Sequence, residues 1–184
     1  AERYAGRSSV PFFELFNEPT DMGGRLGSIT WQQWKEINAD LIRLIRAWDP
    51  DKIVLVAGFD WAYDLTPVRS EPLPFENIAY VSHPYPMKRQ KPWEPQWEKD
   101  WGFVADTYPV FATEIGFCYP TDKGAHVPVM ADEEYGRRIV EYCASKGISW
   151  MVWVFDPDWA PMMFSDWNYT PTHQGAFFKS VLTK

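Results

Sequence analysis

Short apolar runs alternate along this chain with longer segments whose apolar residues recur at helical spacing. Runs that are apolar on both faces are typical of strands in a parallel sheet, with helices covering each face. The pattern therefore predicts an α/β fold with five parallel strands. The expected strands are Val10–Phe16, Ile53–Ala57, Ile78–Ser82, Pro109–Thr113 and Ile148–Phe155.

Helices are predicted between these strands and after the last one. The segment 61–77 holds three prolines and a broken pattern, so we expect a loop there with a single turn of helix. Neither a repeat nor a linker interrupts the sequence, which predicts a single domain over residues 1–184. The expected helical segments are the tail of a helix at Ala1–Arg7, then Thr30–Trp48, Trp93–Thr107, Asp132–Lys146 and Thr172–Leu182.

Charge and hydropathy bound the classes of partner. The formal net charge of -7 does not favour nucleic acid or an anionic membrane surface. The longest apolar run, 148–155, is too short to cross a bilayer, and no apolar leader segment stands at residues 1–4. The two cysteines, Cys118 and Cys143, show no metal-ligand spacing, and we expect free thiols rather than a disulfide.

Aromatic residues are unusually frequent, with 11 Trp, 9 Tyr and 12 Phe. Flat rings suit the apolar faces of pyranose sugars, although tryptophan also fills large protein cores. The composition is therefore compatible with a sugar-binding protein and does not establish one.

Two glutamates follow strand ends. Glu18, within Asn17-Glu18-Pro19, comes after the first strand, and the proline favours an extended backbone before it. Glu114 comes where the fourth apolar strand ends, and Gly116 permits a sharp exit from it. Such strand ends are where (β/α) barrels place their chemistry. Each motif alone also fits a structural role, as a polar turn at Glu18 or a carboxylate paired with Lys or Arg at Glu114.

Three further side chains stand at strand ends. His83 and Tyr85 follow the third strand, in the sequence Ser-His-Pro-Tyr at 82–85. A tyrosine hydroxyl there can donate to a nucleophilic carboxylate and keep it ionised. The imidazole can hold the other glutamate protonated, contact substrate, or simply bond to backbone groups. Trp153 lies near the end of the last strand, where it either forms the floor under a sugar ring or packs inside the barrel.

The order of the strand ends relates the two glutamates to each other. The ends at Gly58 and His83 lie between them, so Glu18 and Glu114 belong to strands three apart in a curved sheet. Around a barrel mouth this arrangement can bring two carboxyl groups to about 5–5.5 Å, the separation of a retaining glycosidase. One carboxyl must then be a protonated acid and the other an ionised nucleophile, so their surroundings must differ.

Together the motifs resemble glycoside hydrolase family 5, whose cellulase-like (β/α)8 barrels carry catalytic glutamates on strands four and seven. The resemblance covers nearly the whole chain. Residue by residue, Asn17 and Glu18 match the strand-four Asn and acid/base, His83 and Tyr85 match the strand-six His-x-Tyr, Glu114 matches the strand-seven nucleophile, and Trp153 matches the strand-eight tryptophan of the cleaved sugar's subsite.

This resemblance implies an incomplete TIM-type barrel whose five strands correspond to strands four to eight. It implies a retaining, endo-type hydrolase of β-linked glycans, in which Glu114 attacks the anomeric carbon and Glu18 protonates the leaving oxygen. Asn17, His83, Tyr85 and Trp153 are then substrate-binding residues. The family chemistry needs no metal or other cofactor, and the resemblance favours a secreted or periplasmic location.

The chain also departs from the family pattern. The family's strand-two Arg and the His after strand three have no counterpart, and the strands that carry them are not in this sequence. Strands 10–16 and 148–155 would have bare edges, which demand cover. We expect a homo-oligomer, most simply a two-fold dimer, to close the open side. A segment from a longer natural protein, or the loop 61–77 folding over the gap, are the other two solutions.

Three functions follow from these observations. The first is a β-glycan hydrolase, weakened by the absence of the arginine partner. The second is a non-catalytic carbohydrate-binding remnant of a barrel that stacks loop aromatics on glycan. The third is an inactive fragment of a longer enzyme. The loop aromatics expected to bind sugar are Trp61, Trp93, Trp159 and Trp167.

Overall fold

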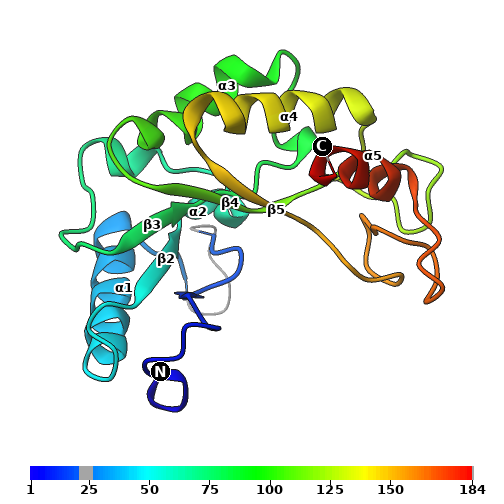
Figure 1. Cartoon of the computed structure of the whole chain (residues 1–184). Helices are drawn as coiled ribbons and strands as arrows, with labels where there is room; N and C mark the ends of the chain where they lie inside the picture. Colours follow the sequence, from blue (N-terminus) through cyan, green and yellow to red (C-terminus); the bar gives the residue numbers. More distant parts are fainter. Residues whose placement is uncertain (21–26, 184) are drawn as a thin grey trace. The chain divides into compact units, whose positions relative to one another are not determined.

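The computed structural model describes residues 1–20 and 27–183. Its five strands form one sheet in the order β1-β2-β3-β4-β5, which is also their order along the chain (Figure 1). The parallel registers place Phe13 beside Val54, Val56 beside Tyr80 and Val81 beside Phe111. The α/β fold with five parallel strands, as in part of a (β/α) barrel, is thereby confirmed. The strands are β1 Phe12–Glu14, β2 Ile53–Ala57, β3 Ile78–Val81, β4 Val110–Ile115 and β5 Ser149–Val152.

A helix follows each of the five strands. The α-helices are α1 Trp31–Arg46, α2 Phe59–Ala62, α3 Trp93–Asp100, α4 Glu133–Lys146 and α5 His173–Leu182. Short 3-10 helices are found at Glu2–Tyr4, Thr66–Arg69, Pro86–Lys88 and Gly102–Asp106. Among the described residues, every helix falls short of the length and hydrophobicity needed to cross a membrane.

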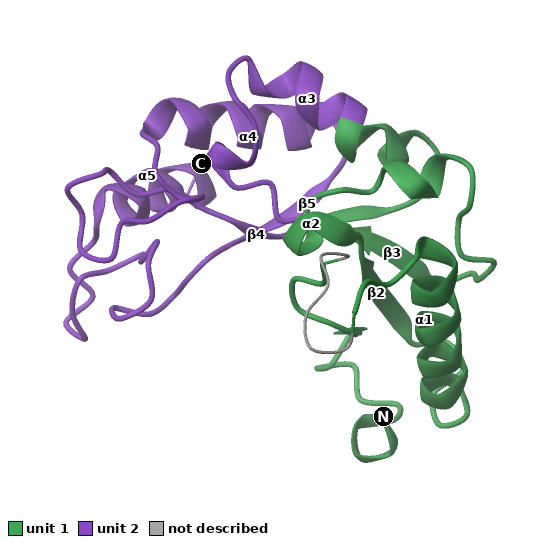
Figure 2. Ribbon diagram, turned by 180° about the vertical axis from the view of Figure 1, so that it is seen from behind, with its two compact units in different colours: residues 1–82, 100–111 green, residues 83–99, 112–184 purple. Residues whose placement is uncertain are grey.

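The chain divides into two compact units (Figure 2). Unit 1 comprises Ala1–Ser82 and Asp100–Phe111, and unit 2 comprises His83–Lys99 and Ala112–Lys184. Strand β4 therefore begins in unit 1 and ends in unit 2. The single domain over residues 1–184 stays a prediction.

Unit 1 is built around β2. One buried cluster contains Leu55, Ala57, Ala62, Ala79 and Val81, with the partly buried Phe12 and Phe111 packed against it. Helix α1 runs beside β2 (Figure 2), and the indole Nε1 of Trp34 donates to the carbonyl of Ala57 at 2.9 Å. The helix begins at a capping box in which the side chains of Thr30 and Gln33 bond to each other's backbone N–H groups. The apolar residues that recur at helical spacing in this segment thus include Trp34, through which α1 packs on the sheet.

Unit 2 has an aromatic core between its helices and the end of β4. The Trp93 and Trp97 rings of α3 stack with centroids 6.0 Å apart, and Trp97 meets Tyr135 of α4 edge to face. The fully buried Phe117 contacts Tyr135 and, on α5, Phe178. Many of the aromatic residues therefore fill the core. Both cysteines are buried and free, as expected.

The two outer strands are shorter than expected, each for a visible reason. Lys52 Nζ donates to the carbonyl of Val10 at 2.7 Å, so a side chain takes the place of a strand partner before β1. After β5, Val154 N donates to the carbonyl of Pro161 at 2.9 Å, so the backbone there bonds to the loop that follows it and not to a neighbouring strand. Apolar sequence alone does not distinguish such loop residues from paired ones.

Two helical expectations also change in extent. The predicted helix 93–107 ends at Asp100 and continues as the 3-10 helix 102–106. The segment 61–77 contains the end of α2 and the 3-10 helix 66–69. Gly58 precedes α2, and a Cβ there would lie 1.9 Å from the carbonyl oxygen of Asp64. Only glycine permits this close approach of two backbone segments.

Candidate active site

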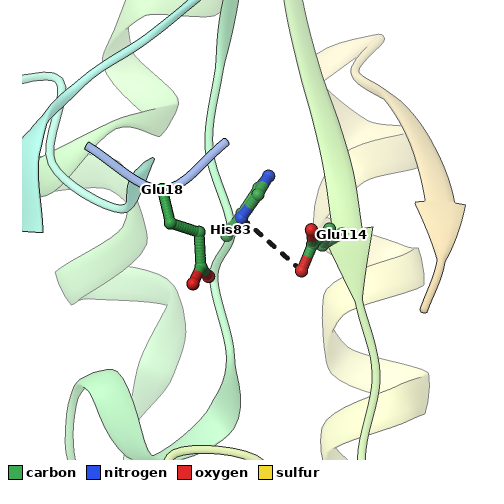
Figure 3. A group of neighbouring side chains, drawn as sticks. All are labelled: Glu18, His83 and Glu114. Carbon is green, nitrogen blue, oxygen red and sulfur yellow. Dashed lines mark ion pairs between the residues drawn. The ribbon is translucent and has the colours of Figure 1, made fainter. Parts of the chain in front are cut away.

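Glu114 lies near the C-terminal end of β4 with 9% of its surface exposed. The hydroxyl of Tyr85 donates to its Oε2 at 2.7 Å. Nδ1 of His83 lies 3.6 Å from the same oxygen, and Figure 3 shows this ion pair as a dashed line. A hydroxyl that donates to a carboxylate stabilises the ionised form. The 3.6 Å contact between Nδ1 and Oε2 is longer than a hydrogen bond, and it is an ion pair when the imidazole is protonated. The sequence-predicted Glu114, Tyr85 and His83 therefore come together.

The His83 ring is fully buried and is held from its other side. Its Nε2 lies 2.9 Å from Oγ1 of Thr113, the residue before Glu114. When the threonine donates to Nε2, the proton of a neutral imidazole sits on Nδ1 and faces Glu114. Thr113 thus holds the His83 ring from the side opposite Glu114, a contact that the sequence pattern did not predict.

The loop that carries His83 and Tyr85 is fixed by a helix far along the chain. The hydroxyl of the fully buried Tyr135, on α4, donates to the carbonyl of Pro84 at 2.7 Å. Ile139 of this helix is also fully buried, and Tyr135 stands one turn before it. That periodicity predicts burial of Tyr135, but not the carbonyl that its hydroxyl meets.

Trp153 follows β5 directly and is partly buried. Its backbone N–H donates to the carbonyl of Ile115 at 2.9 Å, which ties it to the residue after Glu114. Its side chain packs against the cluster that contains Tyr85, and its ring centroid lies 6.4 Å from that of Trp159. The peptide bond between Trp153 and Val154 is cis. Trp153 therefore shares an environment with the Tyr85–Glu114 pair.

Asn17 and Glu18 belong to unit 1, in the segment that follows β1. Asn17 is exposed and Glu18 is partly buried. The segment is anchored on both sides of the pair. The Phe16 ring lies 4.9 Å from that of Trp34, and the carbonyl of Pro19 accepts from Trp61 N at 3.0 Å. Glu18 is also drawn in Figure 3. It lies beyond the end of β1 rather than at its last residue.

The aromatic residues expected to stack on sugar separate into two groups. Trp61, Trp159 and Trp167 expose 40%, 69% and 64% of their surface. Trp93 exposes only 5%, because it lies in α3 against Trp97, so the expectation of a loop aromatic at Trp93 is wrong. A pocket of about 520 Å³ in unit 2 is bordered by Trp93 and Tyr119, and none of the candidate catalytic residues lines it.

Comparison with known proteins decides the family. The family model described as Cellulase (glycosyl hydrolase family 5) matches residues 1–158. The chain belongs to glycosyl hydrolase family 5. The resemblance inferred from the strand-end motifs is thereby confirmed, and Glu18, Glu114 and Trp153 all lie within the matched residues.

Individual relatives of this family 5 chain are longer than it is. Endoglucanase E-5 of Thermobifida fusca is 26% identical over 165 residues, which are 86% of this chain and 32% of the relative. Endoglucanase A of Butyrivibrio fibrisolvens is 31% identical over 151 residues, 82% of this chain and 32% of the relative. The chain thus spans about a third of the length of these curated relatives.

Solved structures agree with the fold of this family 5 chain. A native beta-glucanase from Saccharophagus degradans matches with a TM-score of 0.95 and 52% identity, over 99% of this chain and 56% of that one. A second structure of that beta-glucanase, in complex with cellotetraose, matches with the same TM-score and 50% identity. The five-stranded part of the barrel therefore follows the neighbour's fold over nearly its full length, and spans about half of that neighbour.

Proposed function

We propose that this chain carries the two catalytic carboxylates of a retaining hydrolase of β-linked glucans, with Glu114 as the nucleophile and Glu18 as the acid/base. The observation that carries the proposal is the hydroxyl of Tyr85 donating to the buried Glu114 at 2.7 Å. A carboxylate held ionised by a hydroxyl, at the end of a parallel strand, is suited to attack an electrophilic carbon. Membership of family 5 and the cellotetraose complex of the 50% identical relative support the substrate class.

In the first step the ionised Glu114 attacks the anomeric carbon. The bond from that carbon to the leaving oxygen breaks, and the protonated Glu18 gives its proton to this oxygen. In the second step a water molecule attacks the same carbon while Glu18 takes a proton from the water. The bond between that carbon and Glu114 then breaks. The product keeps the configuration of the substrate, and both carboxyl groups return to their starting states. The cycle needs no metal.

Two of the remaining candidate residues, Asn17 and Trp153, would contact the sugar. Trp153 has a partly buried ring beside the Tyr85 cluster, which suits the apolar face of a pyranose. Asn17 is exposed next to Glu18, and its amide is suited to a sugar hydroxyl. His83 is fully buried, so it acts on Glu114 more directly than on the glycan. The roles of Asn17 and Trp153 are proposals on the same footing as those of the glutamates.

The test separates the two glutamates by the leaving group. The leaving group of a dinitrophenyl glycoside departs without receiving a proton, whereas the sugar that leaves from a glucan must be protonated. Glu18→Gln should therefore lose glucan hydrolysis but keep a rapid burst that releases one equivalent of dinitrophenol, because only the second step then lacks its base, whereas Glu114→Gln should lose both. Glu36→Gln, on an exposed face of α1, is the matched control and should behave like the parent. Equal rates for the parent and Glu114→Gln would reject the assignment.

A second candidate function is binding of glycan without turnover. The exposed rings of Trp159 and Trp167 favour it, since exposed tryptophans stack on sugars. Cellotetraose binding should then persist in Glu18→Gln and weaken in Trp159→Ala. Tryptophan fluorescence titration measures both. Product release by the parent that Glu114→Gln abolishes would exclude this candidate.

We also propose that the chain associates with itself. Among the described strands, β1 and β5 are the two ends of the sheet order, and Met151 and Phe155 near the β5 end expose 45% and 69% of their surface. Exposed apolar residues beside a sheet edge favour association. Light scattering should give twice the mass of one chain, and a monomer mass in dilute solution would reject the dimer.

A further inference from the structure

Gln174 is a buried amide that connects three segments of unit 2. It is the second residue of α5 and exposes only 1% of its surface. Its Oε1 accepts from the backbone N–H of Phe117 at 2.7 Å. Its Nε2 donates to the carbonyls of Trp153 at 2.7 Å and Pro161 at 2.6 Å. One side chain therefore bonds to the strand exit after Glu114, to Trp153 and to the loop beyond it.

The partners fix the orientation of this amide. Both N–H groups have a carbonyl acceptor and the oxygen has a backbone donor. A flipped amide would point N–H at N–H on one side and oxygen at two carbonyls on the other. No other uncharged side chain of this length offers one acceptor and two donors in a plane. The pattern of contacts is therefore specific to glutamine.

Two glycines, Gly116 after β4 and Gly175 in α5, show how closely these segments approach one another. A Cβ at Gly116 would lie 2.8 Å from Gln174 Oε1, from the carbonyl oxygen of Trp153 and from the Pro161 ring. A Cβ at Gly175 would lie 1.7 Å from the carbonyl oxygen of Met163. Both positions are closed to a side chain, so the Gln174 amide lies directly against the strand exit at Gly116, and α5 lies directly against the backbone at Met163.

We propose that Gln174 is a positioning residue that sets Trp153 against the strand end bearing Glu114. This inference rests on the proposed function, because it assigns Gln174 a part in placing the sugar before the nucleophile. Trp153 N already donates to the carbonyl of Ile115, which joins the backbone after β5 to the end of β4. Gln174 adds one bond to Phe117, after β4, and one to the carbonyl of Trp153. Without it, Trp153 keeps one tie to β4 and loses its tie to α5.

A double-mutant cycle tests whether Gln174 acts through Trp153. Gln174→Met keeps the volume and removes every hydrogen bond. It should lower kcat/KM for cellotetraose by about tenfold to a hundredfold, mainly through kcat, because small displacements of a positioned sugar are costly in rate. In a Trp153→Ala background the same substitution should cost less than about twofold. Equal losses in the two backgrounds would overturn the proposal.

Asn38→Leu is the control for loss of a buried amide. Asn38 is fully buried, and its Nδ2 donates to the carbonyl of Trp34 at 2.8 Å within α1. Both substitutions should lower the melting temperature, but only Gln174→Met should lower kcat per folded molecule. A kcat loss in Asn38→Leu that matches the loss in Gln174→Met would mean that a general loss of stability explains both.

Hydrogen exchange makes the result independent of hydrolysis. In the full chain, Gln174→Met should speed backbone amide exchange over residues 115–117 by about tenfold, because the Phe117 N–H loses its acceptor. Unchanged exchange there would overturn the positioning role whether or not the chain cleaves a glycan. Faster exchange in a chain whose parent neither cleaves nor binds cellotetraose would uphold the tie between Gln174 and the backbone after Glu114 and reject the proposed function instead.

Discussion

Replacing Tyr85 by phenylalanine removes one hydroxyl and keeps the ring that packs beside Trp153. The lost contact is the 2.7 Å hydrogen bond to Glu114 Oε2. A hydrogen bond to a charged group contributes about 1.5–3 kcal/mol. The hydroxyl stabilises the ionised carboxylate, so its loss makes Glu114 easier to protonate. At about 1.4 kcal/mol per pH unit, the acid limb of the pH–rate profile should move up by about 1–2 pH units.

The assay is kcat/KM for cellotetraose hydrolysis between pH 4 and pH 9. At pH values on the acid limb of the parent, kcat/KM of Tyr85→Phe should be lower by about tenfold to a hundredfold. At pH values above the acid limb of the variant, the two kcat/KM values should converge. Tyr142→Phe is a close control, because the Tyr142 hydroxyl also donates to a glutamate, Glu98, at 2.7 Å, away from the site. The reasoning is refuted when the limb stays in place in Tyr85→Phe, or moves equally in both variants.

Three further predictions concern stability and accessibility. Burial raises the pKa of Cys143 to about 12, so a thiol reagent at pH 8 should label neither buried cysteine until the protein is unfolded. Gly116→Ala should destabilise the fold by about 1–3 kcal/mol in denaturant titration, because its Cβ would meet three atoms at 2.8 Å. The Gly6 N–H and the Lys52 ammonium hold the pKa of Asp49 below its ordinary value. The stability from this contact is present above the unfolded-state value near 3.9 and is lost as pH falls through the lower folded-state value, so Asp49→Asn should show a smaller loss of melting temperature below pH 4 than the parent.

Sequence reasoning predicts the strands and helices whose ends are marked by local chemistry. The cap at Thr30 marks the start of α1, and Gly147, in the left-handed region at φ +65°, marks the end of α4. The outer strands are less predictable, because Lys52 and Pro161 replace strand partners with contacts that no local pattern encodes. Boundaries set by residues distant in sequence are therefore found only in the structure.

The candidate site divides in the same way. Glu114, His83 and Tyr85 carry functional groups at strand ends, and parallel strands bring such ends to one edge, so their meeting is predictable. Thr113 and Gln174 are not predictable in this way. Each acts through another residue, one on the His83 ring and the other on the backbone around Glu114. Neither side chain type nor spacing reveals such a supporting contact.

The bond between Gln174 and Phe117 joins residues 57 apart in sequence, and this has a consequence for the order of events during synthesis. Strand β4, which carries Glu114, leaves the ribosome well before α5, the helix whose Gln174 bonds to the backbone after that strand. Contacts of long sequence separation form late in folding, because a large loop must close first. A nascent chain arrested before α5 should therefore have β4 in place while the backbone after Glu114 is still unfixed. Completion of the site then becomes the final stage of folding of unit 2.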